Sequence, residues 1–346
     1  MAWLARGSCI TLACYLAKGA VEFEDLSSLP KSDSLADGFR VSLVRPDGEA
    51  ANSGEKQLIS ASSIELLDES ERQVLEDYDA IFEKYSMFCH GRWLGAQILQ
   101  DSQDLLYLQH IIYMRKPDAI VETGTYKGGL TYFFASLLDW VDREEQDLSA
   151  ATSEPKRNTQ VLSIDRHHPD AIYAAKWFCP VCADCIRPYL TPVWDRKVRF
   201  LQGLSDAENT YLMVVENLLD LGVLVLSREE TASEPRIVAD PGKVVVVNLD
   251  ANHEFDGVLR ELVLYGLLVT EHSYLIVQDA KLDKIWGTKG PTAAVEQFLR
   301  SLPPGEFVHE PELAFHGYSQ HIYLRRARVS VPHTFLVDNV MRVHVG

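Results

Sequence analysis

Apolar positions follow two different spacings along this chain. Short apolar runs predict strands, and apolar residues three and four positions apart predict helices. The expected strands are Ala119–Val121, Val161–Ile164, Val198–Gln202, Val244–Leu249 and Tyr274–Val277, followed by a hairpin-like pair, Phe307–Glu310 and His321–Arg325. The expected helices are Ile64–Tyr85, Asp104–Met114, Leu130–Leu138, Val258–Leu268 and Thr292–Leu302.

The order of these elements predicts an α/β fold. Strands and helices alternate after residue 119, and three of the strands are almost wholly apolar, as in a parallel sheet covered on both faces. Two polar insertions, Asp142–Gln160 and Ser227–Lys243, are expected to be loops. We therefore divide the chain into a mobile acidic extension (1–63), a helical lead-in (64–118), the α/β domain (119–328) and a tail (329–346).

The composition of the chain limits the classes of partner that the protein is expected to bind. The chain has 346 residues, of which 47% are hydrophobic, and a net charge of −17. Such a charge disfavours nucleic acid and anionic membranes as partners, although more than half of it lies in residues 21–80. No run approaches 18 apolar residues, so no membrane span is expected. We expect a cytoplasmic protein; the alternative is that residues 1–20, which contain no acid, are a targeting segment.

Six cysteines are too few for a disulfide scaffold, so we expect reduced thiols. Cys179, Cys182 and Cys185 form C-x-x-C-x-x-C, a spacing that can bind zinc if a fourth ligand, such as His167 or His168, comes from elsewhere. No second C-x-x-C pair is present. We therefore favour simple thiols over a zinc site.

A glycine-rich turn follows the first strand of the α/β domain. Val121 to Gly129 read V-E-T-G-T-Y-K-G-G and precede the helix expected from Leu130. Glycines allow close approach of the backbone to a ligand, and a helix N-terminus offers free N–H donors. Glu122 at the strand end suits the amines or hydroxyls of a nucleoside-type cofactor. The alternative is an ordinary strand-to-helix turn.

Further acidic side chains end the other strands. Ligands bind beyond the carboxyl ends of the strands in open parallel sheets. Asp165 is placed to accept hydrogen bonds from ribose hydroxyls, unless it only caps a helix. Asp250 and Asp279, with Gln278 as a neutral oxygen donor, are candidate ligands for Mg²⁺, unless they too only cap helices. His253 is a candidate acceptor for a proton from a substrate hydroxyl, or a plain loop histidine.

Taken together, the motifs resemble those of the cephalosporin hydroxylase / rhamnosyl O-methyltransferase family. The match runs from about Trp93 to Arg325. Its most specific part is the segment L-D-A-N-H-E from Leu249, followed by V-L-R-E-L from Val258, S-Y-L-I-V from Ser273, and Asp279.

This resemblance implies a class I methyltransferase fold dependent on S-adenosylmethionine (SAM), a Rossmann-like α/β fold with a seven-stranded, mostly parallel sheet, a reversed last pair, and helices on both faces. It implies a divalent metal at Asp250 and Asp279. The expected cofactor-binding residues are Glu122, Gly124, Thr125, Gly128, Gly129, Asp165 and Ser205; Asp250 and His253 are the expected catalytic residues.

Two positions depart from the family pattern. Gln278 stands where the family typically has Glu, and Leu204 stands within a segment that usually reads G-D-S. The first change removes a negative charge from the expected metal site. Both changes are the features that favour an alternative to an enzyme, namely a decayed, non-catalytic SAM-binding protein.

The function we expect is SAM-dependent O-methylation of a hydroxyl of a sugar or other small natural product, assisted by Mg²⁺. A nicotinamide oxidoreductase would need a compact G-x-G-x-x-G, which is absent. The family name and His168-Pro169-Asp170 suggest a hydroxylase, but non-haem iron chemistry of that type normally uses an all-β fold. The sequence specifies neither the acceptor nor whether the protein forms a homo-oligomer.

Overall fold

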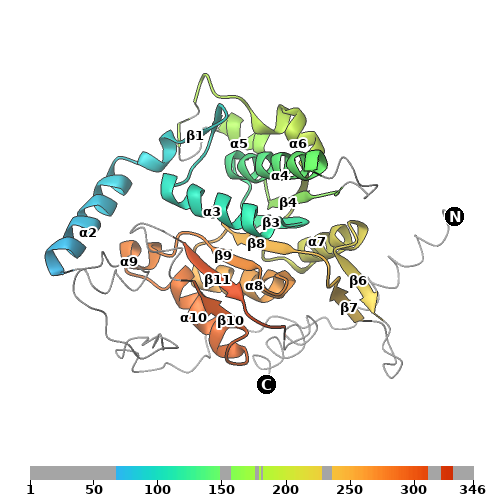
Figure 1. Cartoon of the computed structure of the whole chain (residues 1–346). Helices are drawn as coiled ribbons and strands as arrows, with labels where there is room; N and C mark the ends of the chain where they lie inside the picture. Colours follow the sequence, from blue (N-terminus) through green and yellow to red (C-terminus); the bar gives the residue numbers. More distant parts are fainter. Residues whose placement is uncertain are drawn as a thin grey trace, which may run out of the picture.

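The computed structural model describes residues 68–148, 157–175, 179–180, 182–227, 236–310 and 321–329. Its centre is a seven-stranded sheet of order β10-β11-β9-β8-β3-β4-β5 (Figure 1). The strands are β3 (Ala119–Thr123), β4 (Gln160–Asp165), β5 (Val198–Gln202), β8 (Val245–Leu249), β9 (Tyr274–Val277), β10 (Phe307–His309) and β11 (Ile322–Arg326). β11 runs antiparallel to both of its neighbours, so the predicted seven-stranded sheet with a reversed last pair is confirmed.

The direction of the chain across the sheet changes beside β3. The chain places β4 and then β5 on one side of β3, and returns to place β8 and β9 on the other side. The carboxyl ends of β3 and β8 lie together, because Thr123 pairs with Leu249. In such sheets, ligands bind at the point where the chain reverses its direction across the sheet. The loops that follow β3 and β8 are therefore the expected binding region.

Helices cover both faces of the sheet (Figure 1). Side chains of α3 (Ser102–Arg115) and α4 (Gly129–Leu148) join one buried apolar cluster on the first face. Side chains of α7 (Glu208–Asp220), α8 (Phe255–Tyr265) and α10 (Pro291–Ser301) form the second cluster on the opposite face. Alternate residues along each strand point to opposite faces, which explains why Ile120 belongs to the first cluster and Val121 to the second.

Short elements complete the described chain. Asp68 is the N-cap of α2 (Glu69–Lys84) and forms a capping box with Glu71. Ion pairs to Glu83 and Glu76 from Lys281 and Lys284 join α2 to the region of α9. The remaining elements are η3 (Met87–His90), β1 (Arg92–Trp93), β2 (Ala96–Gln97), α5 (Pro169–Ala175), η4 (Pro188–Leu190), α6 (Pro192–Lys197), β6 (Leu224–Ser227), β7 (Arg236–Ala239), η5 (Gly266–Leu268) and α9 (Leu282–Trp286).

Both predicted loop insertions need correction. The first, Asp142–Gln160, begins inside a helix, because α4 continues to Leu148. Its charged residues were misleading: Asp142 is buried against Lys197, and the charged residues that follow it lie on the outer, intermediate or exposed part of the same helix. The second, Ser227–Lys243, contains β7, which pairs antiparallel with β6.

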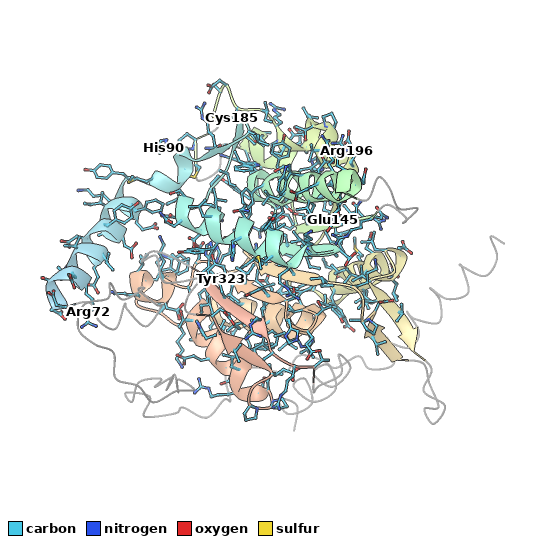
Figure 2. The ribbon with its side chains drawn as sticks, in the orientation of Figure 1. Arg72, His90, Glu145, Cys185, Arg196 and Tyr323 are labelled. Carbon is cyan, nitrogen blue, oxygen red and sulfur yellow. A yellow bond between two sulfur atoms is a disulfide. The ribbon has the colours of Figure 1, made fainter. Side chains whose placement is uncertain are left out.

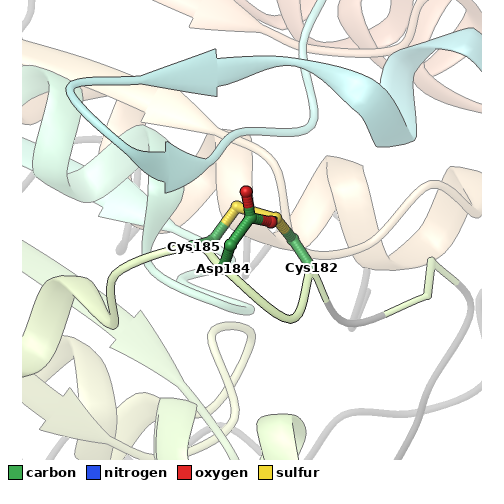
Figure 3. Close-up of side chains that lie close together, drawn as sticks. All are labelled: Cys182, Asp184 and Cys185. Carbon is green, nitrogen blue, oxygen red and sulfur yellow. A yellow bond between two sulfur atoms is a disulfide. The ribbon is translucent and has the colours of Figure 1, made fainter.

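The expectation of free thiols is wrong for four cysteines. Cys89 is disulfide-bonded to Cys179, and Cys182 to Cys185. Figure 3 shows the second bridge, with the Asp184 carboxylate beside it. Three thiolates are therefore not available together for zinc, because Cys179 is bonded to a residue 90 positions away.

Some predictions concern other parts of the chain. The acidic extension 1–63, the targeting alternative for residues 1–20 and nearly all of the tail 329–346 lie outside the described residues. Among the helices that the structure does describe, none combines the length and the apolar character that a membrane span needs.

Candidate functional site

Four acidic residues lie at, or just beyond, the carboxyl ends of four neighbouring strands. Glu122 lies in β3 and Asp165 ends β4, while Asp250 follows β8 and Asp279 lies two positions after β9. These strands are adjacent in the order β9-β8-β3-β4. The charges act on one another: Asp279 and Glu122 both raise the pKa of Asp250, after burial, and Asp165 contributes to the raised pKa of Glu122. The structure thus brings all four carboxylates to one edge of the sheet.

The glycines of the turn after β3 are explained by the protein's own packing. A Cβ added to Gly124 would lie 2.0 Å from the Asp250 carbonyl oxygen, and one on Gly129 would lie 2.1 Å from the Gln97 carbonyl oxygen. Gly124 and Gly128 also have φ angles of +86° and +79°, a region that favours glycine. Gly124 therefore allows the loops after β3 and β8 to pack closely, and Gly129 allows the turn to pack against β2.

Glu122 is a buried carboxylate on the α3/α4 face of the sheet. The hydroxyls of Thr131 and Ser163 both donate to its Oε2, at 2.5 and 2.6 Å. Burial raises the pKa of Glu122 to about 7, although these two hydrogen bonds lower it. Among the described residues, Glu122 Oε1 has no hydrogen-bond partner, nor has Nδ2 of its cross-strand neighbour Asn248. Such unpartnered buried atoms are suited to a polar ligand.

Asp165 is hydrogen-bonded to the backbone of the turn after β3 and of its own loop. Its Oδ2 accepts a hydrogen bond from the Tyr126 backbone N–H at 2.8 Å, and its Oδ1 accepts one from the His167 N–H at 2.9 Å. The Thr125 hydroxyl is hydrogen-bonded to Ser163 at 2.6 Å. Each carboxylate oxygen of Asp165 keeps a second lone pair, so this half-buried side chain can still accept hydrogen bonds from ribose hydroxyls.

Asp250, His253 and Asp279 form a second group at this edge. One ligand atom of each lies within 4.8 Å of the others. The His253 Nε2 is 3.6 Å from the Asp279 Oδ2, and both side chains are about one-third exposed. Burial and the neighbouring carboxylates Asp279, Glu122 and Glu261 raise the pKa of Asp250. Close carboxylate oxygens that repel one another fit a divalent cation between them.

The side chain of Gln278 is not grouped with those of Asp250 and Asp279, although the sequence analysis expected it there. Its side chain is 1% exposed, and its Oε1 accepts a hydrogen bond from Gln100 Nε2 at 2.6 Å. Its Nε2 donates to Asn248 Oδ1 at 2.8 Å. The structure therefore groups His253, rather than Gln278, with the two aspartates.

Ser205 lies on the α7/α8 side of the sheet. Its carbonyl oxygen accepts a hydrogen bond from the Tyr265 hydroxyl at 2.7 Å. It is also hydrogen-bonded to Glu261, a fully buried carboxylate of α8 that the sequence analysis missed. Burial raises the pKa of Glu261 to about 8, although hydrogen bonds from Ser205 and Thr123 lower it. A charged residue among the apolar positions of the expected helix was the available signal.

Lys127 is a second buried charged residue beside the candidate site that the sequence analysis missed. It lies in the glycine turn and is 1% exposed. Its Nζ donates to Gln97 Oε1 at 3.0 Å and to the Cys179 carbonyl oxygen at 2.8 Å. Gln97 Nε2 in turn donates to the Cys89 carbonyl oxygen. Lys127 therefore attaches the cysteine segment to the turn, and the Cys89–Cys179 disulfide attaches the same segment to η3.

The sequence of this chain is similar to those of known proteins. The family model described as "Rhamnosyl O-methyltransferase/CmcI" matches residues 84–182 and 229–327. A rhamnosyl O-methyltransferase of Mycobacterium leprae is 25% identical over 244 residues, which cover 67% of this chain and 83% of that protein.

Solved structures show weaker likeness. A complex of CmcI with Mg and SAM has 16% sequence identity and a TM-score of 0.40, and the match covers 69% of this chain and 78% of that one. An O-methyltransferase from Bacillus cereus in complex with SAH has 13% identity and a TM-score of 0.38, over 77% and 94% of the two chains.

Proposed function

Because this chain belongs to the rhamnosyl O-methyltransferase/CmcI family, we propose that this SAM-dependent methyltransferase acts on a hydroxyl of a sugar or sugar-bearing natural product, assisted by a divalent cation. The family resemblance seen in the sequence is confirmed by the family match. One observation carries the finer part of the proposal: Asp250, His253 and Asp279 lie together at the same edge of the sheet as Glu122 and Asp165.

The cofactor half of the site consists of groups that bind and orient. Asp165 is proposed to accept hydrogen bonds from the ribose hydroxyls of SAM, and Glu122 to accept one from its amino group through the unpartnered Oε1. Gly124, Gly128, Gly129 and Thr125 keep the turn in place beneath them. SAM, when bound, supplies an electrophilic methyl group on a sulfonium, so that this half needs only to hold it in line with the acceptor oxygen.

The acceptor half contains the acid–base groups. Asp250 and Asp279 are proposed to hold the cation, because Mg²⁺ prefers oxygen ligands. A cation at this place lowers the pKa of an acceptor hydroxyl bound to it. His253 is proposed to accept the hydroxyl proton at its imidazole, and Asp279, 3.6 Å away, stabilises the resulting imidazolium. Gln278 and Ser205 are not given a direct role, since both are engaged with other protein groups.

Labelled-methyl transfer tests the activity. Purified full-length protein is incubated with methyl-labelled SAM and a panel of rhamnosides, other glycosides and simple phenols, with Mg²⁺ or with EDTA. We expect transfer to a sugar hydroxyl that falls at least 100-fold in EDTA. Transfer to phenols alone would contradict the sugar acceptor, and equal rates in EDTA would contradict the cation.

Substitution of His253 distinguishes a general base from a ligand of the cation. For His253→Gln we expect kcat to fall about 100-fold, as for other general bases, with the affinity for Mn²⁺ unchanged. Loss of Mn²⁺ binding instead would make His253 a ligand.

A non-catalytic SAM-binding protein is the second candidate, and Gln278 is the observation in its favour. It predicts that SAM binds and that no acceptor in the panel is methylated.

A further inference from the structure

A chain of buried hydrogen bonds runs beneath the proposed cation site, and no step of the proposed reaction uses it. Its members come from segments far apart in sequence: Gln100 precedes α3, Asn248 lies in β8, Gln278 follows β9 and His321 precedes β11. Apart from Gln100, which is half-buried, these side chains are almost fully buried. Hydrogen bonds between buried side chains are strong because the local dielectric is low, so they hold their members in one arrangement.

The chain begins at the backbone of Asp279. Asp279 has a φ of +55°, a left-handed conformation that is strained for a residue other than glycine. Its N–H donates to His321 Nδ1 at 3.3 Å. On the other side, its carbonyl oxygen accepts from the Leu282 N–H at 3.0 Å. The strained turn is thus held from both sides, and it directs the Asp279 carboxylate to His253 while Gln278 remains inside.

The contacts of His321 assign its tautomer. Because Nδ1 accepts a hydrogen bond from Asp279, the ring proton is on Nε2. Nε2 faces Gln100 Oε1 at 3.0 Å and Asp104 Oδ2 at 3.5 Å. Gln100 then donates through Nε2 to Gln278 Oε1, and Gln278 donates through Nε2 to Asn248 Oδ1. Every donor along the chain therefore points the same way, from Asp279 toward Asn248.

This direction explains the amide at position 278. The side chain accepts from Gln100 and donates to Asn248, which an amide can do and an ionised carboxylate cannot. A glutamate has no hydrogen to donate when ionised, so it would leave Asn248 Oδ1 without its donor and add a third carboxylate beside Asp250 and Asp279. Gln278 is thus matched to this network.

We propose that His321 is a positioning residue for the cation site, a role that rests on the proposed function. It holds Asp279 in its strained conformation, and Gln100 and Gln278 keep the imidazole in the one tautomer that can do so. His321 touches neither cofactor nor acceptor; it acts through the placement of the Asp279 carboxylate.

Two substitutions of His321 separate its two nitrogens. His321→Asn keeps an acceptor near the position of Nδ1, whereas His321→Gln keeps a polar group near Nε2 and removes the acceptor for Asp279. The probe is Mn²⁺ added to the full-length protein, with free Mn²⁺ followed by electron paramagnetic resonance. We expect His321→Gln to bind Mn²⁺ at least 10-fold more weakly and His321→Asn to stay within about threefold of wild type.

Tyr323→Phe is the matched control for general damage to the cluster. Tyr323 is equally buried, and its hydroxyl donates to Asp104 Oδ1 at 3.3 Å; Figure 2 labels it in the sheet. We expect a lower melting temperature and unchanged Mn²⁺ affinity. Gln100→Leu, which removes the partner of Nε2, should weaken Mn²⁺ binding several-fold and serves if a histidine variant does not fold.

SAM affinity, measured by calorimetry, separates this inference from the proposed function. All four variants should bind SAM within about threefold of wild type. If wild type binds Mn²⁺ and His321→Gln and Gln100→Leu bind it equally well, the positioning role is wrong while the cation site stands. If wild type binds no Mn²⁺, the cation part of the proposed function fails and this inference fails with it. Equal loss in His321→Asn and His321→Gln would also contradict it.

Discussion

The two halves of the site meet at the same edge of the sheet but differ in how their charges are satisfied. On the β3/β4 side, Asp165 accepts two backbone hydrogen bonds and one oxygen of Glu122 accepts two from hydroxyls. On the β8/β9 side, Asp250 and Asp279 repel one another, and Asp279 adopts a strained backbone conformation. We infer that the cofactor half is formed in advance, whereas the acceptor half needs a cation to relieve its repulsion.

Removing a carboxylate on the β8/β9 side should have the largest effect. For Asp250→Asn and Asp279→Asn we expect kcat/KM to fall about 1,000-fold, because a catalytic metal ion contributes several kcal/mol to the stabilisation of the transition state. The SAM Kd should stay within about threefold. A large loss of SAM affinity in either variant would show that the two halves are not independent.

The buried carboxylate of the β3/β4 side should make stability depend on pH. The pKa of Glu122 in the folded protein, about 7, is above its ordinary value of 4.5. The folded state therefore holds the proton more tightly, and this contribution is present below pH ~4.5 and lost as the pH rises to about 7. The free energy of unfolding should fall by about 3 kcal/mol over that range at most. In Glu122→Gln this fall should disappear, measured by urea unfolding at several pH values.

Glu145→Gln is a control of opposite sign. Burial raises the pKa of Glu145, but hydrogen bonds from Lys116 and Arg157 lower it overall; Figure 2 labels Glu145. Its stabilising contribution should therefore be lost as the pH falls. If Glu122→Gln and Glu145→Gln change the profile in the same direction, the assignment of Glu122 is wrong.

Asp165→Ala tests the cofactor half of the site. Loss of charge-assisted hydrogen bonds to ribose, worth about 1.5–3 kcal/mol, should weaken SAM binding 10- to 100-fold by calorimetry. The Mn²⁺ affinity should not change. Asp170→Ala is the matched control, since Asp170 is an exposed aspartate whose carboxylate accepts hydrogen bonds from Arg187 and Tyr189; this variant should bind SAM normally. A normal SAM Kd in Asp165→Ala would remove Asp165 from the cofactor site.

Gln278→Glu should have the smallest effect, and it decides between an adapted and a decayed enzyme. In an adapted enzyme the new carboxylate breaks the hydrogen bond to Asn248, and activity should fall about 5- to 10-fold, the cost of one buried hydrogen bond. Activity and Mn²⁺ affinity are measured together. A gain in Mn²⁺ affinity with a gain in activity would mean that the wild-type site has decayed.

The strands of the main sheet could be predicted because apolar runs are local signals, whereas their arrangement in the sheet was implied only by the family resemblance. The five parallel strands begin and end within two residues of the predicted positions. α7 was also predictable, since Tyr211, Val214, Val215 and Leu218 follow helical spacing and are all buried, but it was overlooked. The grouping of Glu122, Asp165, Asp250 and Asp279 followed from the rule that parallel strands end at one edge.

The supporting residues could not be predicted in the same way. The Gln100–His321 contact joins residues 221 positions apart, and the Cys89–Cys179 disulfide joins residues 90 positions apart. No local pattern encodes such pairings. Gln278 shows the same limit, because whether its side chain points toward the site or the interior depends on the backbone turn at Asp279 rather than on residue type.

Calorimetric titration of SAM into wild-type protein, once with Mg²⁺ and once with EDTA, tests the division into two halves most directly. We predict one molecule of SAM bound per chain with the same Kd in both buffers. Absence of binding in both would contradict the proposed cofactor site, and binding that requires Mg²⁺ would contradict a cofactor half formed in advance.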